Sequence, residues 1–379
     1  MRVLILDYLH RTWAEISLSA LENNFKEIKR RAKGAKIMAV VKANAYGHGA
    51  DIVAPFLEKL GADAFAVSNI DEAISLRKCG ITAPVLILGY TPANLAETLS
   101  ANNISQCVYS LEYARHLSDC ASKADADINI HLKLDTGMSR LGFDFRGDCD
   151  CEAQDLLLAA KLPHLNTEGV FTHFAAADSD DGGCVKFTEA QHERFLKGVD
   201  FLRENGICPE YIHCDNSAAI CREKYTFNTV RPGIILYGLS PDRDFDPDMK
   251  LIPVMTLKSV VSFVKTVKKG TPVSYGMTYT APRDMKIATV AAGYADGYPR
   301  KLSNTGELLV CGRRVKVTGR VCMDQLMIDV NGIGDIKTGD EVILFGKDLS
   351  VDEIAEKCGT ISYETVCGIA PRVPRIAVE

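Results

Sequence analysis

The stretch "AVVKANAYGHG", residues 39–49, ends an apolar run on a lysine. The run begins at Ile37 and predicts a β-strand that is buried on both faces, because such strands are continuous apolar segments. Lys42 follows at the point where the strand should end, and Tyr46 comes shortly after it. A strand-end lysine taken alone is more often solvated or ion-paired than catalytic. The role of Lys42 therefore has to be inferred from the rest of the chain.

Seven more short apolar segments follow in the first two-thirds of the chain, and amphipathic stretches separate most of them. The eight predicted strands are "KIMAVVK" (36–42), "DAFAVSN" (63–69), "PVLILGY" (84–90), "SQCVYS" (105–110), "INIHLKLD" (128–135), "GVFTHFA" (169–175), "YIHCDN" (211–216) and "FNTVR" (227–231). Helices are predicted between them, for example at residues 71–80 and 188–206. This alternation predicts parallel strands, and eight of them can close into a (β/α)₈ barrel. The alternative is an open doubly wound sheet, but its GxGxxG fingerprint is missing after the first strand.

The pattern changes near Pro247. Short β-branched segments separated by turns predict a mostly antiparallel β domain: "SVVSFVKTVKKG" (259–270), "KIATVAAGYADG" (286–297), "RRVKVTGRVCMD" (313–324) and "DEVILFG" (340–346). Residues 350–359 predict one helix, with a capping box between Ser350 and Glu353 and with Gly359 as its C-terminal stop. The sequence therefore predicts an α/β chain with a barrel at residues 16–245 and a β domain at residues 246–379. We expect residues 1–15 to pack with the β domain.

The composition excludes several classes of protein. The chain has 379 residues, of which 25% are charged, and a formal net charge of −5. No block of lysines and arginines stands out, so we expect neither a nucleic-acid partner nor binding to an anionic membrane surface. The thirteen cysteines show no paired CxxC spacing, which predicts reduced thiols in the cytoplasm and no metal site. Asp7 interrupts the first apolar run, so no signal peptide is predicted, and no run reaches the ~18 residues of a membrane span.

In a (β/α)₈ barrel the C-terminal ends of the strands meet at one mouth, where catalysis takes place. The residues predicted at this mouth are Lys42, Tyr46, Arg140, His173, Asn216, Ser217, Arg231, Gly233 and Ile234. A lysine there is suited to forming a Schiff base, and hydroxyls with N–H groups at a helix N-terminus are suited to binding phosphate. An aldehyde cofactor with a phosphate group meets both needs, which points to pyridoxal phosphate. Each residue taken singly has an ordinary structural explanation, and "RPGIILYG" (231–238) is also consistent with a plain strand.

The stretch "AVVKANAYGHG" closely resembles the cofactor-lysine signature of the alanine racemase family, which has fold type III among pyridoxal phosphate enzymes. The resemblance runs from "RTWAEISLSAL" (11–21) nearly to the end, through "HLKLDTGMSRLG" (131–142), "GVFTHFAAAD" (169–178), "HCDNSAA" (213–219), "VRPGIILYG" (230–238), "VSYGMTYTA" (273–281), "GYADGY" (293–298), "GRVCMDQ" (319–325), "TISYE" (360–364) and "RVPRI" (372–376). It implies an isomerase that interconverts L- and D-alanine and supplies D-alanine for peptidoglycan. It also implies a homodimer with shared active sites.

The resemblance assigns a role to each matching residue. It implies that Lys42 binds pyridoxal phosphate covalently and that Lys42 and Tyr275 are the two catalytic bases, with Tyr275 supplied by the other subunit. The implied cofactor contacts are Tyr46, His173, Asn216, Ser217, Arg231, Gly233, Ile234 and Tyr363. The substrate carboxylate is expected at Arg140 and at the N–H of Met323. The implied supporting residues are Lys133, His213, Tyr294, Cys322 and Asp324. Residues 233–238 are then expected to begin as a phosphate-binding helix instead of a strand.

The resemblance places Arg231 at the pyridine nitrogen, where many pyridoxal enzymes have a carboxylate. A permanent cation cannot accept the pyridine proton and disfavours ring protonation, so the carbanion should be short-lived and transamination rare. Tyr275 needs nearby cations or hydrogen bonds to act as a base, because a phenol has a pKa near ~10. The family pattern offers His173, Arg231 and Tyr294 for this purpose.

Two positions are undecided by the sequence. Lys133 matches a lysine that is carbamylated in many family members, but it is also consistent with a barrel-interior lysine paired with Asp135. Asp215 stands where the family pattern leads us to expect alanine, and it places a carboxylate near the predicted phosphate loop.

Three other functions are alternatives for this sequence. A decarboxylase of basic amino acids on the same architecture should have a carboxylate at the position of Arg231. A non-catalytic pyridoxal-binding barrel protein should lack the β domain that bears Tyr275. A serine or broad-specificity racemase is disfavoured by Tyr363 and Met323, which are expected to narrow the pocket around a methyl group, although some serine activity is expected.

Overall fold

The computed structural model describes residues 11–147, 150–225, 227–242 and 249–379. Residues 1–10, with the signal-peptide prediction, and the expected domain boundary at residues 245 and 246 lie outside this part. The chain divides into two compact units. The β unit comprises the described residues up to Leu21, together with Tyr46–Gly49 and Ile252–Glu379. The barrel unit comprises Glu22–Ala45 and Ala50–Leu251.

The barrel unit contains the predicted parallel sheet. In order across the sheet its strands are β10 (Thr229–Val230), β2 (Lys36–Val40), β3 (Ala64–Val67), β4 (Val85–Ile87), β5 (Ile104–Val108), β6 (Ile128–Asp135), β8 (Leu165–Phe171) and β9 (Tyr211–His213). Each of the eight predicted segments overlaps one of these strands. The N–H of Arg231, just after β10, donates to the carbonyl of Asp215, just after β9, at 3.0 Å. The two end strands are thereby joined, so the sheet forms a nearly closed barrel.

Burial explains why these strands were predictable. All residues of β3, β4 and β5 are buried, as expected for parallel strands that are covered on both faces. The exception is β8, which begins at Leu165, four residues before the predicted segment. Its first half contains Asn166, Thr167 and Glu168, so no apolar run marks the start of the strand.

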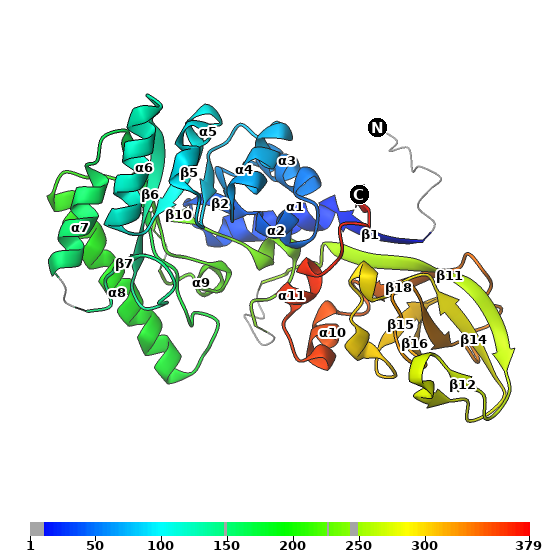
Figure 1. Ribbon diagram of the computed structural model, residues 1–379. Coiled ribbons are helices and arrows are strands. Elements are labelled where there is room, and N and C mark those ends of the chain that lie inside the picture. The colour runs from blue at the N-terminus through cyan, green and yellow to red at the C-terminus, as the bar shows by residue number, and fades with distance from the viewer. Residues whose placement is uncertain (1–10, 148–149, 226, 243–248) are drawn as a thin grey trace. The chain divides into compact units, whose positions relative to one another are not determined.

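Helices connect the strands and lie outside them in Figure 1. They are α1 (Leu18–Arg31), α3 (Ala50–Leu60), α4 (Ile70–Lys78), α5 (Ala96–Ala101), α6 (Leu111–Lys123), α7 (Asp150–Ala160), α8 (Gly182–Glu204) and α9 (Ser217–Arg222). Short elements add α2 (Lys42–Tyr46), the 3₁₀ turns η1 (Ala93–Leu95) and η2 (Ile234–Tyr237), and β7 (Phe143–Asp144), which pairs with β6. Helix α8 begins six residues earlier than predicted because Asp181 caps it, accepting the N–H of Gly183 at 2.9 Å.

The β unit is mostly antiparallel, as predicted. Its main sheet has the order β16 (Arg313–Lys316), β15 (Glu307–Val310), β18 (Glu341–Phe345), β11 (Met255–Val267), β1 (Thr12–Ser17) and β19 (Arg375–Val378). Strand β14 (Met285–Val290) joins β11 to β17 (Leu326–Asp329), and β12 (Pro272–Val273) pairs with β13 (Tyr279–Thr280). The first half of β11 alternates between buried and partly buried residues, which is typical of a sheet with one face on a core. The parallel pair of β1 and β19 was not predicted.

The remaining elements of the β unit are two helices and three turns. They are α10 (Val351–Cys358), α11 (Ser362–Cys367), η3 (Tyr275–Met277), η4 (Tyr294–Asp296) and η5 (Arg300–Leu302). Ser350 and Gly359 delimit α10 as predicted, but the Ser350 hydroxyl accepts the N–H of Asp352 at 3.1 Å instead of that of Glu353. The carboxylate of Glu353 pairs with Arg314 at 2.6 Å. Across the described residues, no helix is long and apolar enough to cross a membrane.

Candidate active site

Lys42 begins a short turn of left-handed helix. The next residues, Ala43, Asn44 and Ala45, have φ of 52°, 53° and 54°, and Tyr46 has φ of 51°. Left-handed backbone costs a residue with a side chain about 1–2 kcal/mol, so four in succession need support from the surrounding structure. Strain of this kind persists at functional sites, where the chain has to hold a side chain in a set place.

Glu72 on α4 supports this turn. One of its carboxylate oxygens accepts the N–H of Ala43 at 2.7 Å, and the other accepts the N–H of Ser68 at 2.8 Å. The side-chain oxygen of Asn44 closes the turn by accepting the N–H of Ala50 at 2.8 Å. The sequence did not identify Glu72 as a site residue, because the contact joins positions 29 residues apart with no motif between them.

We expect Glu72→Gln to destabilise the protein by about 1–3 kcal/mol. Glutamine keeps one acceptor oxygen and replaces the other by an NH₂ group, which then faces a backbone N–H donor and leaves it without an acceptor. The matched control is Glu58→Gln. A single oxygen of Glu58 accepts the N–H groups of Thr82 and Ala83, each at 2.8 Å, so the glutamine oxygen can replace it. The free energy of unfolding in urea measures both effects. Equal losses for the two variants would show that Glu72 does not hold the turn.

Arg231 lies buried inside the barrel mouth. Its Nη1 donates to Nδ1 of His213 at 2.8 Å, and its Nη2 donates to the carbonyls of Thr172 at 2.8 Å and Cys214 at 3.0 Å. Nη2 is also 3.3 Å from Nδ1 of His173. Burial lowers the pKa of Arg231 to about 10, so it remains a cation at neutral pH. Nε is its one nitrogen without a partner among the described residues.

The cations predicted at the mouth all lower the pKa of one neighbouring residue, His173. Burial lowers the pKa of His173 most, and four nearby cations lower it further: Arg231, Lys133, Arg140 and Lys42. His173 is therefore neutral at physiological pH. The barrel unit thus brings together these predicted residues from β6 and from the segments that follow β2, β6, β8 and β10.

Lys133 is buried and lacks the carboxylate partner proposed for it as an ordinary interior lysine. Its ammonium lies 4.9 Å from the centre of the Phe171 ring, and no ion pair of Lys133 occurs in the described part of the chain. Asp135 instead accepts the N–H groups of Gly137 and Ser139, each at 3.0 Å. Burial lowers the pKa of Lys133 to about 8, so a substantial fraction of its amine is neutral near that pH.

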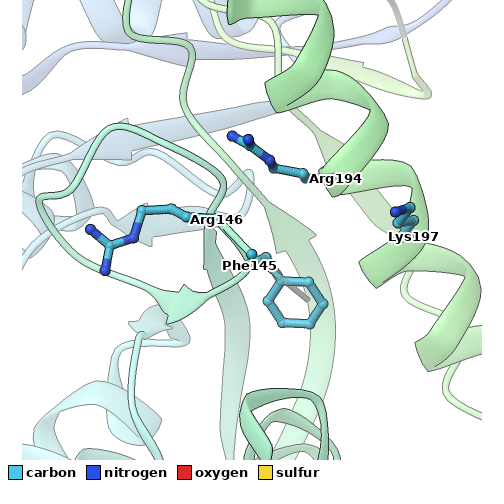
Figure 2. A pocket seen from close by; sticks show the side chains of 5 residues that line it. Phe145, Arg146, Arg194 and Lys197 are labelled. Atoms are coloured by element: carbon cyan, nitrogen blue, oxygen red, sulfur yellow. The ribbon is translucent and has the colours of Figure 1, made fainter. Parts of the chain in front are cut away.

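Arg140 is exposed and is carried by the segment that follows β6. Figure 2 shows a pocket beside this segment, lined by Phe145, Arg146, Gly147, Arg194 and Lys197. Both arginines of the pocket bond the segment that carries Arg140. Arg194 donates to the carbonyl of Thr136 at 2.9 Å, and Arg146 donates to the hydroxyl of Ser139 at 3.1 Å. None of the predicted site residues lines this pocket, so we assign it to support of the Arg140 segment.

Two short helices begin side by side at the predicted phosphate site. Asn216 caps α9 by accepting the N–H of Ala219 at 3.0 Å, and the Ser217 hydroxyl accepts the N–H of Gly233 at 2.9 Å. The 3₁₀ turn η2 begins at Ile234, which confirms the helix expected from the resemblance over a plain strand. The N–H of Ile234 has no acceptor among the described residues. Asp215 is buried beside this site and accepts a bond from the Cys214 thiol at 3.2 Å.

The β unit presents Tyr275 on a strained turn. Ser274 has φ of 67° and ψ of 179°, Gly276 has φ of 70° and Met277 has φ of 50°. The Ser274 hydroxyl anchors the turn by donating to the carbonyl of Arg320 at 2.7 Å. Tyr275 is 71% exposed, and Met277 is 69% exposed. Tyr275 is thus held on a strained turn with its side chain open to solvent, and backbone strain of this kind clusters at functional sites.

The remaining predicted residues also lie in the β unit. The ring centres of Tyr46 and Tyr363 are 6.1 Å apart, and burial raises the pKa of Tyr46. Met323 is exposed, and its N–H has no acceptor among the described residues. The thiol of Cys322 lies 3.6 Å from the hydroxyl of Ser274. Tyr294 is partly exposed at the start of η4.

Asp296 is a further residue of this region that the sequence did not identify. It is fully buried and accepts bonds from Arg11 at 2.8 Å and from Arg372 at 2.8 Å. Arg372 also pairs with Asp324 at 2.7 Å, so Asp324 belongs to the same ionic network. The pairs of this network lie between 48 and 285 residues apart in the chain, so they leave no local pattern in the sequence.

Comparisons with known proteins agree with this geometry. The family model for the alanine racemase N-terminal domain matches residues 16–241, and the model for the C-terminal domain matches residues 254–377. An alanine racemase of Geobacter sp. (strain M21) is 46% identical over 371 residues, which cover 95% of this chain and 97% of that protein.

Solved structures are similar over the same length. The alanine racemase of Clostridium difficile 630 is 41% identical with a TM-score of 0.93, and the match covers 98% of this chain and 97% of that one. The alanine racemase of Bacillus anthracis with bound L-Ala-P is 38% identical with a TM-score of 0.91, and the match covers 99% and 96% of the two chains. With both family models and whole-chain relatives in agreement, the chain belongs to the alanine racemase family.

Proposed function

We propose that the chain is an amino-acid racemase that interconverts L-alanine and D-alanine with pyridoxal phosphate, using Lys42 and Tyr275 as two bases. The observation that carries this proposal is the whole-chain similarity to alanine racemases together with the cationic barrel mouth around Arg231. A decarboxylase on this architecture is disfavoured because the residue that we assign to the pyridine nitrogen is an arginine, Arg231, and not a carboxylate. Supply of D-alanine for peptidoglycan and a cytoplasmic location are part of the same proposal.

The residues of the barrel unit fit pyridoxal phosphate chemically. The Ser217 hydroxyl and the N–H of Ile234 are suited to phosphate oxygens, as are the hydroxyls of Tyr46 and Tyr363 from the β unit. The Nε of Arg231 is suited to donate to the pyridine nitrogen, and the amine of Lys42 is suited to bond the aldehyde. When bound, the cofactor withdraws electrons from Cα of the substrate.

Arg231 limits how far this electron withdrawal proceeds. It is a cation that only donates hydrogen bonds, so it cannot accept a proton from the pyridine nitrogen as a carboxylate could, and its charge disfavours ring protonation. Its four bonds to His213, Thr172, Cys214 and His173 hold the guanidinium in place. Arg231 would thereby keep the lifetime of negative charge at Cα short, which suits racemisation over transamination.

Racemisation needs a proton removed from one face of Cα and a proton delivered to the other face, so two bases on opposite faces can serve both directions. We assign Lys42 to one face and Tyr275 to the other. Because Tyr275, Met277 and Met323 are 71%, 69% and 53% exposed, we propose that a second copy of the chain covers them in a homodimer with shared sites.

Substrate binding completes the proposed site. Arg140 and the N–H of Met323 are assigned to the carboxylate of the substrate. We also propose that Lys133 is carbamylated, because its lowered pKa of about 8 supplies the neutral amine that reacts with carbon dioxide. The resulting carbamate would be an anion that supports the nearby cation Arg140.

The test is an enantiomer-resolved assay of the purified protein with L-alanine, L-serine and L-lysine. We expect full racemisation of alanine and slower racemisation of serine, since one hydroxyl in such a pocket changes discrimination by about 1–3 kcal/mol. Carbon dioxide release from lysine without racemisation of alanine would replace the proposal with the decarboxylase.

A further inference from the structure

A chain of hydrogen bonds continues from Arg231 through the interior of the barrel, beyond the residues that the site requires. His213 accepts from Arg231 at 2.8 Å through Nδ1, and its Nε2 lies 2.8 Å from Nδ1 of His131. Nε2 of His131 lies 3.2 Å from a carboxylate oxygen of Glu168. His213 is 0% exposed and His131 is 1% exposed. Four side chains from β6, β8 and β9 and from the segment after β10 thus form one relay.

The direction of every bond in this relay follows from its first member. A guanidinium only donates, so Nδ1 of His213 has no proton and its Nε2 carries one. That Nε2–H donates to Nδ1 of His131, whose Nε2–H then donates to Glu168. Burial lowers the pKa of both histidines, which favours the neutral rings that this pattern needs. A cation at one end and a carboxylate at the other are therefore linked by two neutral rings in fixed tautomers.

Glu168 is suited to end the relay as an anion. The Ser105 hydroxyl donates to the same oxygen at 2.6 Å. Partial burial raises the pKa of Glu168, but the bonds from His131 and Ser105 and nearby positive charge, including that of Lys36, bring it below its ordinary value. The relay therefore ends in a charged acceptor.

Gly169 shows that the barrel is shaped around His131. Gly169 lies opposite His131 in the register of β8 with β6. A Cβ at Gly169 would lie 2.3 Å from Nδ1 and 2.5 Å from Cε1 of that ring. Its φ is not in the left-handed region, so backbone conformation does not call for glycine. The absence of a side chain here provides the space for the imidazole.

We propose that His131 and Glu168 are positioning residues that act through His213 to hold Arg231 as a donor toward the cofactor ring. Arg231 is buried near the cations Arg140 and Lys133. The carboxylate of Asp215 offsets part of this positive charge, and the relay links Arg231 to a second carboxylate, Glu168, through two neutral rings. A carboxylate acting through an imidazole raises the acceptor strength of the far ring nitrogen, which strengthens the bond from Arg231. The link to the cofactor rests on the proposed function, but the relay itself does not.

The first test determines by NMR which ring nitrogen of His213 carries a proton, in protein labelled with ¹⁵N in its histidine rings. We expect His213 to show a proton on Nε2 and none on Nδ1. Glu168→Gln removes the charge but keeps an acceptor, and it does not touch His213. We expect this variant to move the Nε2–H signal of His213 upfield all the same, because the effect passes through His131. An unchanged His213 signal would overturn the relay, whether or not the protein racemises alanine.

The matched control is Asp63→Asn. Asp63 and Glu168 share a neighbour, Tyr211. Both carboxylates raise the pKa of Tyr211, although burial and Glu210 raise it more. Asp63 accepts the N–H of Ile37 at 2.7 Å, and in the described part of the chain it makes no hydrogen bond or ion pair with a relay residue. We expect the His213 signal and the turnover rate to stay at wild-type values in this variant. A signal that moves equally in both variants would indicate a general loss of charge and would overturn the proposal.

The second test reads the effect on chemistry. We expect Glu168→Gln to lower kcat for alanine about tenfold with little change in KM, and to increase conversion of the bound cofactor to its amine form. If the wild type racemises alanine and the variant keeps its kcat, the positioning role is wrong. If the wild type does not racemise alanine, the proposed function fails, and the NMR result still decides the relay.

A double-mutant cycle tests the space at Gly169. We expect Gly169→Ala to lower kcat as Glu168→Gln does, because the ring of His131 has to move. Its effect on the free energy of unfolding should disappear in a His131→Ala background, where the clash is absent. An equal loss in both backgrounds would show that glycine is needed for a reason other than the histidine.

Discussion

Lys42→Ala is expected to reduce racemisation of alanine by about four orders of magnitude or more. The change removes the amine that we assign both to cofactor attachment and to proton transfer on one face of Cα, and proton transfer alone is worth about 10²–10⁴. The purified variant should also lose the yellow colour of a covalently held cofactor. Borohydride reduction of the wild type, followed by peptide mapping, should leave the cofactor on Lys42.

The matched control is Lys36→Ala, at the other end of the same strand. Lys36 pairs with Glu210 and contacts the ring of Tyr211, so it has ordinary surface partners. We expect it to keep its colour and nearly all its activity, since exposed ion pairs contribute about 0–1 kcal/mol. A label found on any lysine other than Lys42 would contradict the assignment.

Tyr275→Phe is expected to disable one direction of proton exchange and most of the turnover. Tyr275 is assigned to the face of L-alanine and Lys42 to the face of D-alanine. Exchange of the Cα proton with deuterated water should therefore survive better from D-alanine than from L-alanine. The control is Tyr279→Phe on β13, because among the described residues the hydroxyl of Tyr279 bonds only the sulfur of Met285, at 3.7 Å. Equal loss from both enantiomers would indicate a single base or general damage.

Mixing the two inactive variants tests whether the sites are shared. Lys42→Ala and Tyr275→Phe chains are unfolded together and refolded, with mass tags to prove that mixed dimers form. If each site takes Lys42 from one chain and Tyr275 from the other, every mixed dimer has one intact site. Random pairing makes half the dimers mixed, so about a quarter of the wild-type activity should return. Proven exchange without recovery would rule out shared sites.

The barrel was predictable because its strands carry their own signal. Strands β3, β4 and β5 are covered on both faces, so each is a short apolar run that can be recognised without its neighbours. The strands β1 and β19 lack that signal. They pair with each other although about 360 residues separate them, and β19 is only partly buried throughout. Pairing at such a distance depends on the folded chain and leaves no local pattern.

The candidate site also has features that the sequence predicted and features that only the folded chain decided. The sequence alone predicted Lys42, Arg140, His173 and Arg231 as residues of the mouth, because chemical type and position after a strand are local properties, and the structure places the three cations near His173. Only the tertiary structure decided the left-handed turn after Lys42, since nothing in Ala43 or Ala45 favours positive φ and Glu72 holds the turn from another helix. It also decided the relay from Arg231 to Glu168, because hydrogen bonds between side chains on separate strands exist only once the barrel has brought them within 3 Å or so.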